Sequence, residues 1–167
     1  MSQVHTVFGS ITDYTKGSIE LVSGEARHYV FSNMFEVASR SCPYERVAVG
    51  KNFEYVIECA RAEGASPWYV AGHDEFVVCM DGRVEVQLVK LDHPGKVVPA
   101  GSDGAHRLAG PPEGRKMGRI SLGRGHMALL PAGAAYRFDS ATPCTLMIQT
   151  IQGPETIERW AEICQTK

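Results

Sequence analysis

A few ionisable side chains in the middle of the chain could together bind a reactive metal ion. His73 and Glu75 are two residues apart, so both point to the same side of the backbone if this segment is a strand. His126 lies further along the chain and could approach them in a folded sheet. Two imidazoles and one carboxylate on one face form the ligand set that holds non-haem Fe(II). The alternative is that both histidines are satisfied pocket or surface residues.

The composition is that of a globular protein with one core. The chain has 167 residues, 44% of them hydrophobic, and a formal net charge of -2, which does not favour binding to nucleic acid or to a membrane. It contains no apolar run of membrane-spanning length and no pattern of a secretory signal at its start. The cysteines form no CxxC pair, so we expect reduced thiols in a cytoplasmic protein: Cys42, Cys59, Cys79, Cys144 and Cys164.

Most of the regular patterns in the sequence favour β-strands. Hydrophobic runs flank Asp81-Gly82, a pair that is typical of a tight hairpin turn. After this pair Val84, Val86 and Leu88 alternate with polar residues, which predicts one buried and one exposed face. Strand signals cover 47–60, 74–92, 126–138 and 144–151. Many short strands with Gly and Pro turns predict a mainly β fold, either a small antiparallel barrel or a jelly roll.

We interpret residues 1–167 as a single domain with an N-terminal arm at 1–45, a barrel core at 46–152 that includes a long loop at 93–122, and a C-terminal helix at 154–166. Pro154 favours a helix start. Ile157, Trp160 and Ile163 then fall on one face of the helix. This face could pack on the barrel or on a partner chain.

Two segments allow more than one interpretation. Residues 31–41 suit either a strand or a short helix capped by Ser32. Residues 93–125 are rich in Gly and Pro and carry six basic but only two acidic side chains. A loop of this kind can be merely solvated, can contact a partner subunit, or can act as a lid that attracts an anionic ligand.

Two half-motifs in the sequence resemble those of the cupins. Glu75, six residues and Gly82 match the end of the first cupin motif, G-x5-H-x-H-x3–4-E-x6-G. Pro131 and Gly133 match the second motif, G-x5-P-x-G-x2-H, whose last position is Tyr136. The resemblance implies a cupin-type antiparallel β-barrel (jelly roll) with a C-terminal helix.

The metal ligands of the cupin motifs are largely missing. The two histidine positions of the first motif fall on Tyr69 and Ala71 with its shorter spacing, or on Trp68 and Val70 with its longer spacing. Tyr136 stands at the histidine position of the second motif, so only Glu75 remains. A transition metal needs about three good donors, and the usual cupin metal site is therefore expected to be absent.

A narrower resemblance covers most of the chain. The small subunit of the two-subunit hydroquinone dioxygenases is similar in length and in the segments "RHYVFSNMFEVASRS", "YERVAVGKNFEYVIECARAEG", "SPWYVAGHDEFVVCMDGRVEV" and "GRKMGRISLGRGHMALLPAGAAYRF". This resemblance implies ring cleavage of hydroquinone by O2 to 4-hydroxymuconic semialdehyde, in the degradation of 4-nitrophenol-type aromatics. It also implies a heterotetramer in which a larger cupin subunit binds Fe(II), while this chain has no metal and no catalytic residue.

Four residues of this chain are expected to line a pocket or to contact the phenolic substrate: Trp68, His73, Glu75 and Tyr136. The alternative for each is packing within its own chain. Two other functions stay open. One is a stand-alone cupin enzyme with a metal site displaced to His73, Glu75 and His126, and the other is a ligand-binding or regulatory cupin with an open apolar barrel.

Overall fold

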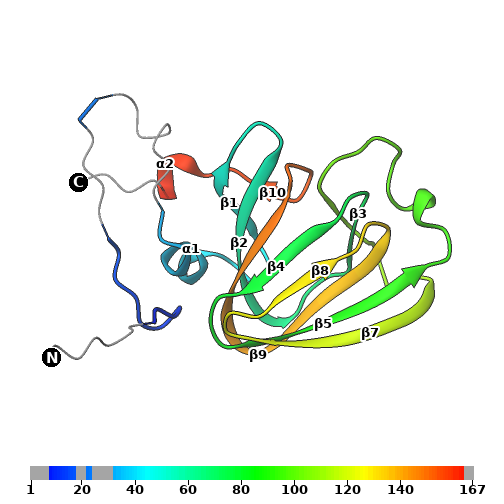
Figure 1. Ribbon diagram of the computed structural model, residues 1–167, viewed down its shortest axis with the longest axis horizontal. Coiled ribbons are helices and arrows are strands. Elements are labelled where there is room, and N and C mark those ends of the chain that lie inside the picture. Colours follow the sequence, from blue (N-terminus) through cyan, green and yellow to red (C-terminus); the bar gives the residue numbers. More distant parts are fainter. Residues whose placement is uncertain (1–7, 18–21, 24–31, 164–167) are drawn as a thin grey trace, which may run out of the picture.

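The computed structural model describes residues 8–17, 22–23 and 32–163. In Figure 1 these residues form a curled sheet with short helices at one end. The strands in this part of the chain are β1 (Arg46–Lys51), β2 (Tyr55–Ala65), β3 (Tyr69–Ala71), β4 (Glu75–Cys79), β5 (Arg83–Leu91), β6 (Ala105–Arg107), β7 (Gly114–Gly123), β8 (Met127–Leu130), β9 (Ala134–Ile151) and β10 (Thr156–Ile157). The helices are α1 (Met34–Arg40), the 3-10 helix η2 (Pro94–Lys96) and α2 (Trp160–Ile163).

Strand β9 joins the two layers of the fold. Its first half, 134–139, pairs with β5 and β3, and β7 and β6 extend this first layer. Its second half, 144–151, pairs with β2 and β4, and β1, β10 and β8 extend this second layer. Only β1 and β10 pair in parallel among these strands. The predicted mainly β fold, an antiparallel jelly roll, is confirmed.

The main core lies between the two layers. Val84, Val86 and Leu88 on β5 are buried, as their alternation predicted. Phe138 and Ile148, from the two halves of β9, belong to the same cluster. The core is thus built from inward positions that recur every second residue along each strand.

The hairpin predicted at Asp81-Gly82 is wrong. Strands β4 and β5 do not pair with each other, because β4 pairs with the second half of β9 and β5 with the first half. The Asp81 carboxylate accepts hydrogen bonds from the backbone N–H of Thr145 at 2.5 Å and of Ile11 at 2.6 Å. Gly82 has φ 64°, and a methyl group there would lie 2.7 Å from Cβ of Cys144. The pair forms a corner at which the chain crosses from one layer to the other.

The long loop predicted at 93–122 also needs correction, because it contains β6 and most of β7. Among the described strands β7 pairs with β5 alone, so it forms an edge of the described sheet. Arg115, Lys116 and Arg119 are exposed along this edge. Basic side chains on an edge strand oppose pairing with other chains, which accounts for part of the positive charge in this segment.

The two ends of the chain differ in part from the prediction. The segment 31–41 contains a helix, α1, and its N-cap is Asn33 rather than Ser32, because the Asn33 side chain accepts hydrogen bonds from the first turn. The helix expected at 154–166 begins only at α2, and β10 precedes it. Residues 164–166 lie outside the described residues.

Helices α1 and α2 pack on part of the outer face of the second layer. Val37 and Ala38 of α1 and Ile163 of α2 form a small cluster with Val47 and Cys59 of the sheet. In Figure 1 both helices lie at the end of the sheet that carries β1 and β10. No helix in the described ranges is long and apolar enough to cross a bilayer.

Candidate functional site: the cupin metal position

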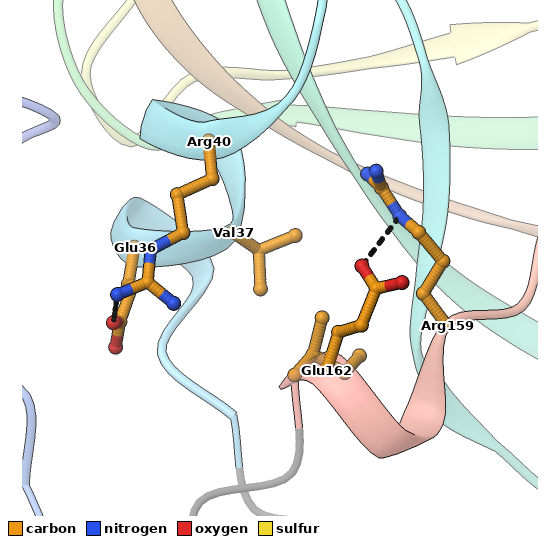
Figure 2. A pocket seen from close by; sticks show the side chains of 6 residues that line it. Glu36, Val37, Arg40, Arg159 and Glu162 are labelled. Carbon is orange, nitrogen blue, oxygen red and sulfur yellow. Dashed lines mark ion pairs between the residues drawn. The ribbon is translucent and has the colours of Figure 1, made fainter.

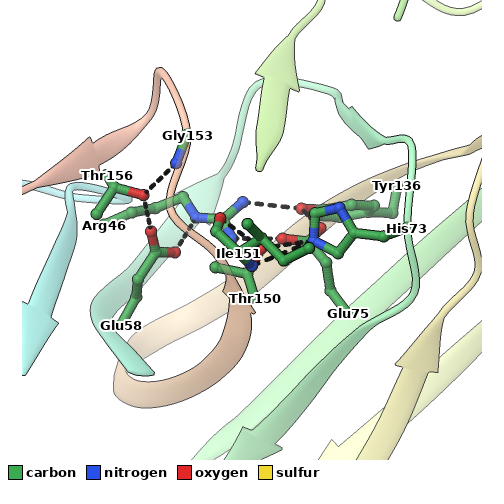
Figure 3. Close-up of polar contacts among 9 residues, drawn as sticks. All are labelled: Arg46, Glu58, His73, Glu75, Tyr136, Thr150, Ile151, Gly153 and Thr156. Atoms are coloured by element: carbon green, nitrogen blue, oxygen red, sulfur yellow. Dashed lines mark hydrogen bonds and ion pairs between the residues drawn. The ribbon is translucent and has the colours of Figure 1, made fainter. Parts of the chain in front are cut away.

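The residues at the cupin ligand positions meet around the guanidinium group of Arg46. Its Nη2 donates to Oε1 of Glu75 at 2.7 Å, and its Nη1 donates to the Tyr136 hydroxyl at 2.8 Å. The Tyr136 hydroxyl in turn donates to the other oxygen of Glu75. The guanidinium carbon lies 5.7 Å from the centre of the Tyr69 ring. Figure 3 shows Arg46 extending toward Glu75 and Tyr136. A protein cation therefore lies among the positions where a cupin holds its metal.

The structure also decides between the two possible spacings of the first motif. Tyr69 belongs to the main core, with its ring 5.8 Å from that of Tyr136. Trp68 and Val70 pack in a separate cluster on the other face of β3. The shorter spacing, with Tyr69 and Ala71 at the histidine positions, is the one that places both residues toward Glu75.

A second carboxylate binds the opposite side of the same guanidinium group. Arg46 Nε donates to Glu58 at 2.5 Å, and the Thr156 hydroxyl donates to the other Glu58 oxygen at 2.6 Å. Arg46 and Glu58 are 3% and 1% exposed, and Glu75 is fully buried. One positive and up to two negative charges are thus removed from water and must balance one another.

The two carboxylates respond differently to this environment. Burial favours a raised pKa for Glu75, but the Arg46 charge and the Tyr136 hydrogen bond hold its pKa below the ordinary value. For Glu58 the effect of burial is larger than the opposing effects of the Arg46 charge and the Thr156 hydrogen bond, so its pKa is raised. Burial likewise raises the pKa of Tyr136 well above 10, and the nearby Glu75 adds to this effect. Of the two carboxylates that pair with Arg46, Glu75 is thus the one that its surroundings keep more readily ionised, and Tyr136 stays a neutral phenol.

These residues do not fit a divalent metal ion. Ala71 offers no donor atom, and the neutral Tyr136 phenol is a poor ligand. A metal would have to displace the guanidinium group from one oxygen of Glu75 or the Tyr136 hydroxyl from the other. Among the described residues no group of three or more His, Cys, Asp or Glu side chains is placed to hold a metal.

The alternative metal site at His73, Glu75 and His126 is not assembled. His73 Nε2 lies 3.0 Å from the Thr150 hydroxyl and accepts a hydrogen bond from the backbone of Ile151. His126 is exposed, and its backbone pairs with Cys79 at the opposite end of β4 from Glu75. Four residues along a strand span about 13 Å, so the three side chains cannot share one ion.

The four residues expected at a pocket do not form one site either. Glu75 and Tyr136 are buried in the Arg46 network. Trp68 lies on another face, with the guanidinium of Arg137 stacked 5.0 Å from its ring centre. His73 borders two surface hollows, one lined also by the segment that contains η2 and one beside Phe76, and Trp68 lines a separate hollow with Arg137.

A further hollow of about 130 Å³ lies between α1 and α2 (Figure 2), and charged side chains line it. Arg40 binds Glu36 at 2.7 Å, and Arg159 lies 3.9 Å from Glu162. Each ion pair lies within one wall of the hollow and balances the charge of that wall, so the hollow presents no unbalanced charge to a ligand.

The sequence analysis missed Arg46 and Glu58. The sequence nevertheless contained a sign of both residues, because each is a charged residue in a strand whose other inward positions are apolar. Glu58 shares the inward face of β2 with Val56 and Ala60. A charge on such a face requires a buried partner of opposite sign, and Arg46 on the neighbouring strand could have been proposed for it.

Comparisons with known proteins agree with the fold and refine it. No protein-family model matches the chain, and no match was found among curated proteins. A cupin-2 domain protein from Shewanella frigidimarina matches 77% of this chain and all of its own, with 16% identity and a TM-score of 0.50. With the two half-motifs converging on one point, this likeness defines a cupin fold.

Closer matches identify the family. The hydroquinone 1,2-dioxygenase of Sphingomonas sp. TTNP3, solved with 4-hydroxybenzoate bound, has a chain 58% identical to this one, with 99% of both chains covered and a TM-score of 0.94. The chain therefore belongs to the hydroquinone 1,2-dioxygenase family.

The family contains chains of two sizes. In the enzyme PnpCD, solved with Cd2+ and 4-hydroxybenzonitrile, one chain is 52% identical to this one, with 98% of both covered and a TM-score of 0.91. A longer PnpCD chain, from a structure with Fe3+, matches over only 40% of its own length, with 14% identity and a TM-score of 0.61. The present chain corresponds to the smaller subunit, and it shares its fold with part of the larger one.

Proposed function

We propose that this chain is the metal-free small subunit of an Fe(II)-dependent hydroquinone dioxygenase that acts in aromatic degradation. The complete enzyme would convert hydroquinone and O2 into 4-hydroxymuconic semialdehyde, with both oxygen atoms retained in the product. The observation that carries the proposal is the 58% identity to a hydroquinone 1,2-dioxygenase chain over 99% of both chains. The position of Arg46 supports it, because its guanidinium group lies between Glu58 and Glu75, at the position where a cupin would hold its iron.

In this proposal the iron and the chemistry belong to a larger cupin subunit, and the two kinds of chain form a heterotetramer. The small subunit would stabilise the larger one by covering its apolar surface and would help to exclude water from the reaction. His73 and Trp68 are the side chains of the expected set that could approach a substrate, because each borders a hollow at the surface.

The interior of the barrel argues against the ligand-binding alternative. Tyr136 and Phe138 are buried and pack edge to face at 5.5 Å between ring centres. Tyr44 stacks on Phe138 at 6.4 Å. These aromatic rings fill the space that a ligand-binding cupin keeps open.

Reconstitution tests the proposed function. We expect hydroquinone-dependent O2 uptake when this chain is mixed anaerobically with its cognate larger chain and Fe(II) and then exposed to O2. Each chain alone, with the same Fe(II), is the control and is expected to be inactive or nearly so. Cleavage of hydroquinone by this chain alone, or an unchanged rate when it is added to the larger chain, would contradict the proposal.

A further inference from the structure

The two layers of the jelly roll have very different outer faces. On the first layer part of the outer face is polar, with cross-strand rows such as Arg119, Gln87 and Arg137, and its apolar part, around Val70, Val89 and Ala135, is covered by Val98 and Leu108 of the segment between β5 and β7. This is the usual pattern for an antiparallel sheet with one face in water. On the second layer the outward positions away from α1 and α2 are apolar apart from one glutamine. They are Tyr55, Ile57, Phe76, Val78, Met127, Leu129, Met147, Gln149 and Ile151.

These nine side chains, which we call the apolar face, form a continuous surface. Strand register places Leu129, Phe76, Gln149 and Ile57 in one row across β8, β4, β9 and β2. The four strands lie side by side in the second layer (Figure 1), and no described helix covers this part of it. Met127 is 62% exposed. Hydrophobic side chains of this size are ordinarily buried, so a row of them at the surface indicates an interface.

The apolar face also contains a hollow. It has a volume of about 320 Å³ and lies between Tyr55, Phe76 and Ile151, with His73 and Asp74 at its border. A pocket within an apolar patch is the kind of feature that receives an anchoring side chain from a partner protein.

We propose that the apolar face is the surface on which the larger dioxygenase chain docks, through an apolar face of its own. This inference rests on the proposed function, which supplies the larger chain. Four strands at about 4.8 Å spacing and roughly four residues of each give an apolar area on the order of 300 Å². A standard interface buries about 800 Å² on each partner, so the apolar face has the size of an interface core that a polar rim completes.

The absence of charge on the face determines the chemistry of its occupant. None of the nine side chains is ionisable at neutral pH, so the face has no charged group that an acidic or basic partner could pair with. The larger chain of PnpCD contains a part with the same fold as this chain. Two such sheets can pack face to face at about 10 Å through apolar side chains. A second copy of this chain is the competing occupant, and the experiment distinguishes the two.

Methionine oxidation tests the docking site without any substitution. Met127 lies on the apolar face, and Met117, 49% exposed on β7, is a matched control on the other layer. Hydrogen peroxide converts exposed methionines to sulfoxides that mass spectrometry locates. We expect Met127 to be oxidised about tenfold more slowly in the complex with the larger chain than in this chain alone, because a buried thioether is shielded. Met117 is expected to react equally in both.

The possible outcomes distinguish the docking site from the proposed function and from binding of a second copy. If the complex forms but Met127 reacts as fast as in the free chain, the docking site is wrong and the proposed function stands. If no complex forms, by native mass, the proposed function fails together with the inference. If Met127 is already protected in this chain alone, in proportion to its concentration, a second copy is the occupant and the proposal is overturned.

A pair of variants provides an independent test. M127K combined with L129K places two charges on the outward side of β8, which pairs only with β4. This variant is expected to keep the melting temperature of the wild type and to lose binding to the larger chain. M117K is the control and should bind normally. Equal binding by both variants would contradict the inference.

Discussion

Replacing Arg46 with methionine is expected to lower the free energy of unfolding by about 3–5 kcal/mol, because it leaves buried carboxylates without their cation. The guanidinium group contacts Glu58, Glu75 and Tyr136, and all of these side chains are removed from water. Methionine fills much of the same volume but offers no charge. For a chain of this size the melting temperature should fall by about 6–20 °C.

The control for this prediction is an arginine in an exposed ion pair. Arg119 lies 3.4 Å from Glu85 and is 67% exposed, so Arg119→Met should change stability by less than about 1 kcal/mol. Adding Glu58→Gln and Glu75→Gln to Arg46→Met removes the isolated charges and should recover part of the loss. An effect of Arg46→Met no larger than that of Arg119→Met would show that the buried network does not hold the fold together.

Glu75→Gln is expected to destabilise the protein by about 3 kcal/mol, and Glu58→Gln by about 1 kcal/mol or less. The difference follows from their pKa values. Glu75 has a lowered pKa and carries the charge that balances Arg46, whereas burial raises the pKa of Glu58. Urea unfolding at neutral pH, with the two single variants as each other's control, measures both losses.

The same pKa shifts predict opposite pH dependences. The lowered pKa of Glu75 gives stability that is present above about 4.3, the value in an unfolded chain, and is lost as the pH falls through the folded-state pKa. The raised pKa of Glu58 gives stability that is present below about 4.3 and is lost as the pH rises through its folded-state pKa. Glu75→Gln should therefore flatten the acid limb of the stability curve. A larger loss for Glu58→Gln, or an unchanged acid limb in Glu75→Gln, would reverse the assignment.

Local pattern was sufficient to predict most of the longer strands, with the exception of β7. Alternation fixed which face of β5 is buried, because side chains on a strand change sides at every residue. The two motifs bring Glu75 and Tyr136 into contact, and the glycines Gly82 and Gly133 in their turns have positive φ. Residues close in sequence to a well-marked turn are thus within reach of sequence reasoning.

Long-range pairing was not predictable in this way. Asp81-Gly82 has the chemistry of a hairpin turn, but the pairing of β4 and β5 with opposite halves of β9 makes it a corner. Strand β7 was predicted as a loop because its exposed edge position requires little alternation. Arg46 and Glu75 are 29 positions apart in the sequence. Only the folded sheet brings them together, so the spacing of residues along the chain could not predict their contact.

The buried guanidinium group of Arg46 lies where a cupin would hold its metal. We propose that this chain therefore supports an active site in another subunit. The most direct test is elemental analysis for iron, manganese, zinc and nickel after anaerobic incubation with Fe(II) and desalting. The isolated chain should bind no metal above background, and the assembled enzyme should contain iron that remains with the larger chain when the subunits are separated. Near-stoichiometric metal in the isolated chain would contradict the account, because Arg46 and a metal ion cannot share the oxygens of Glu75.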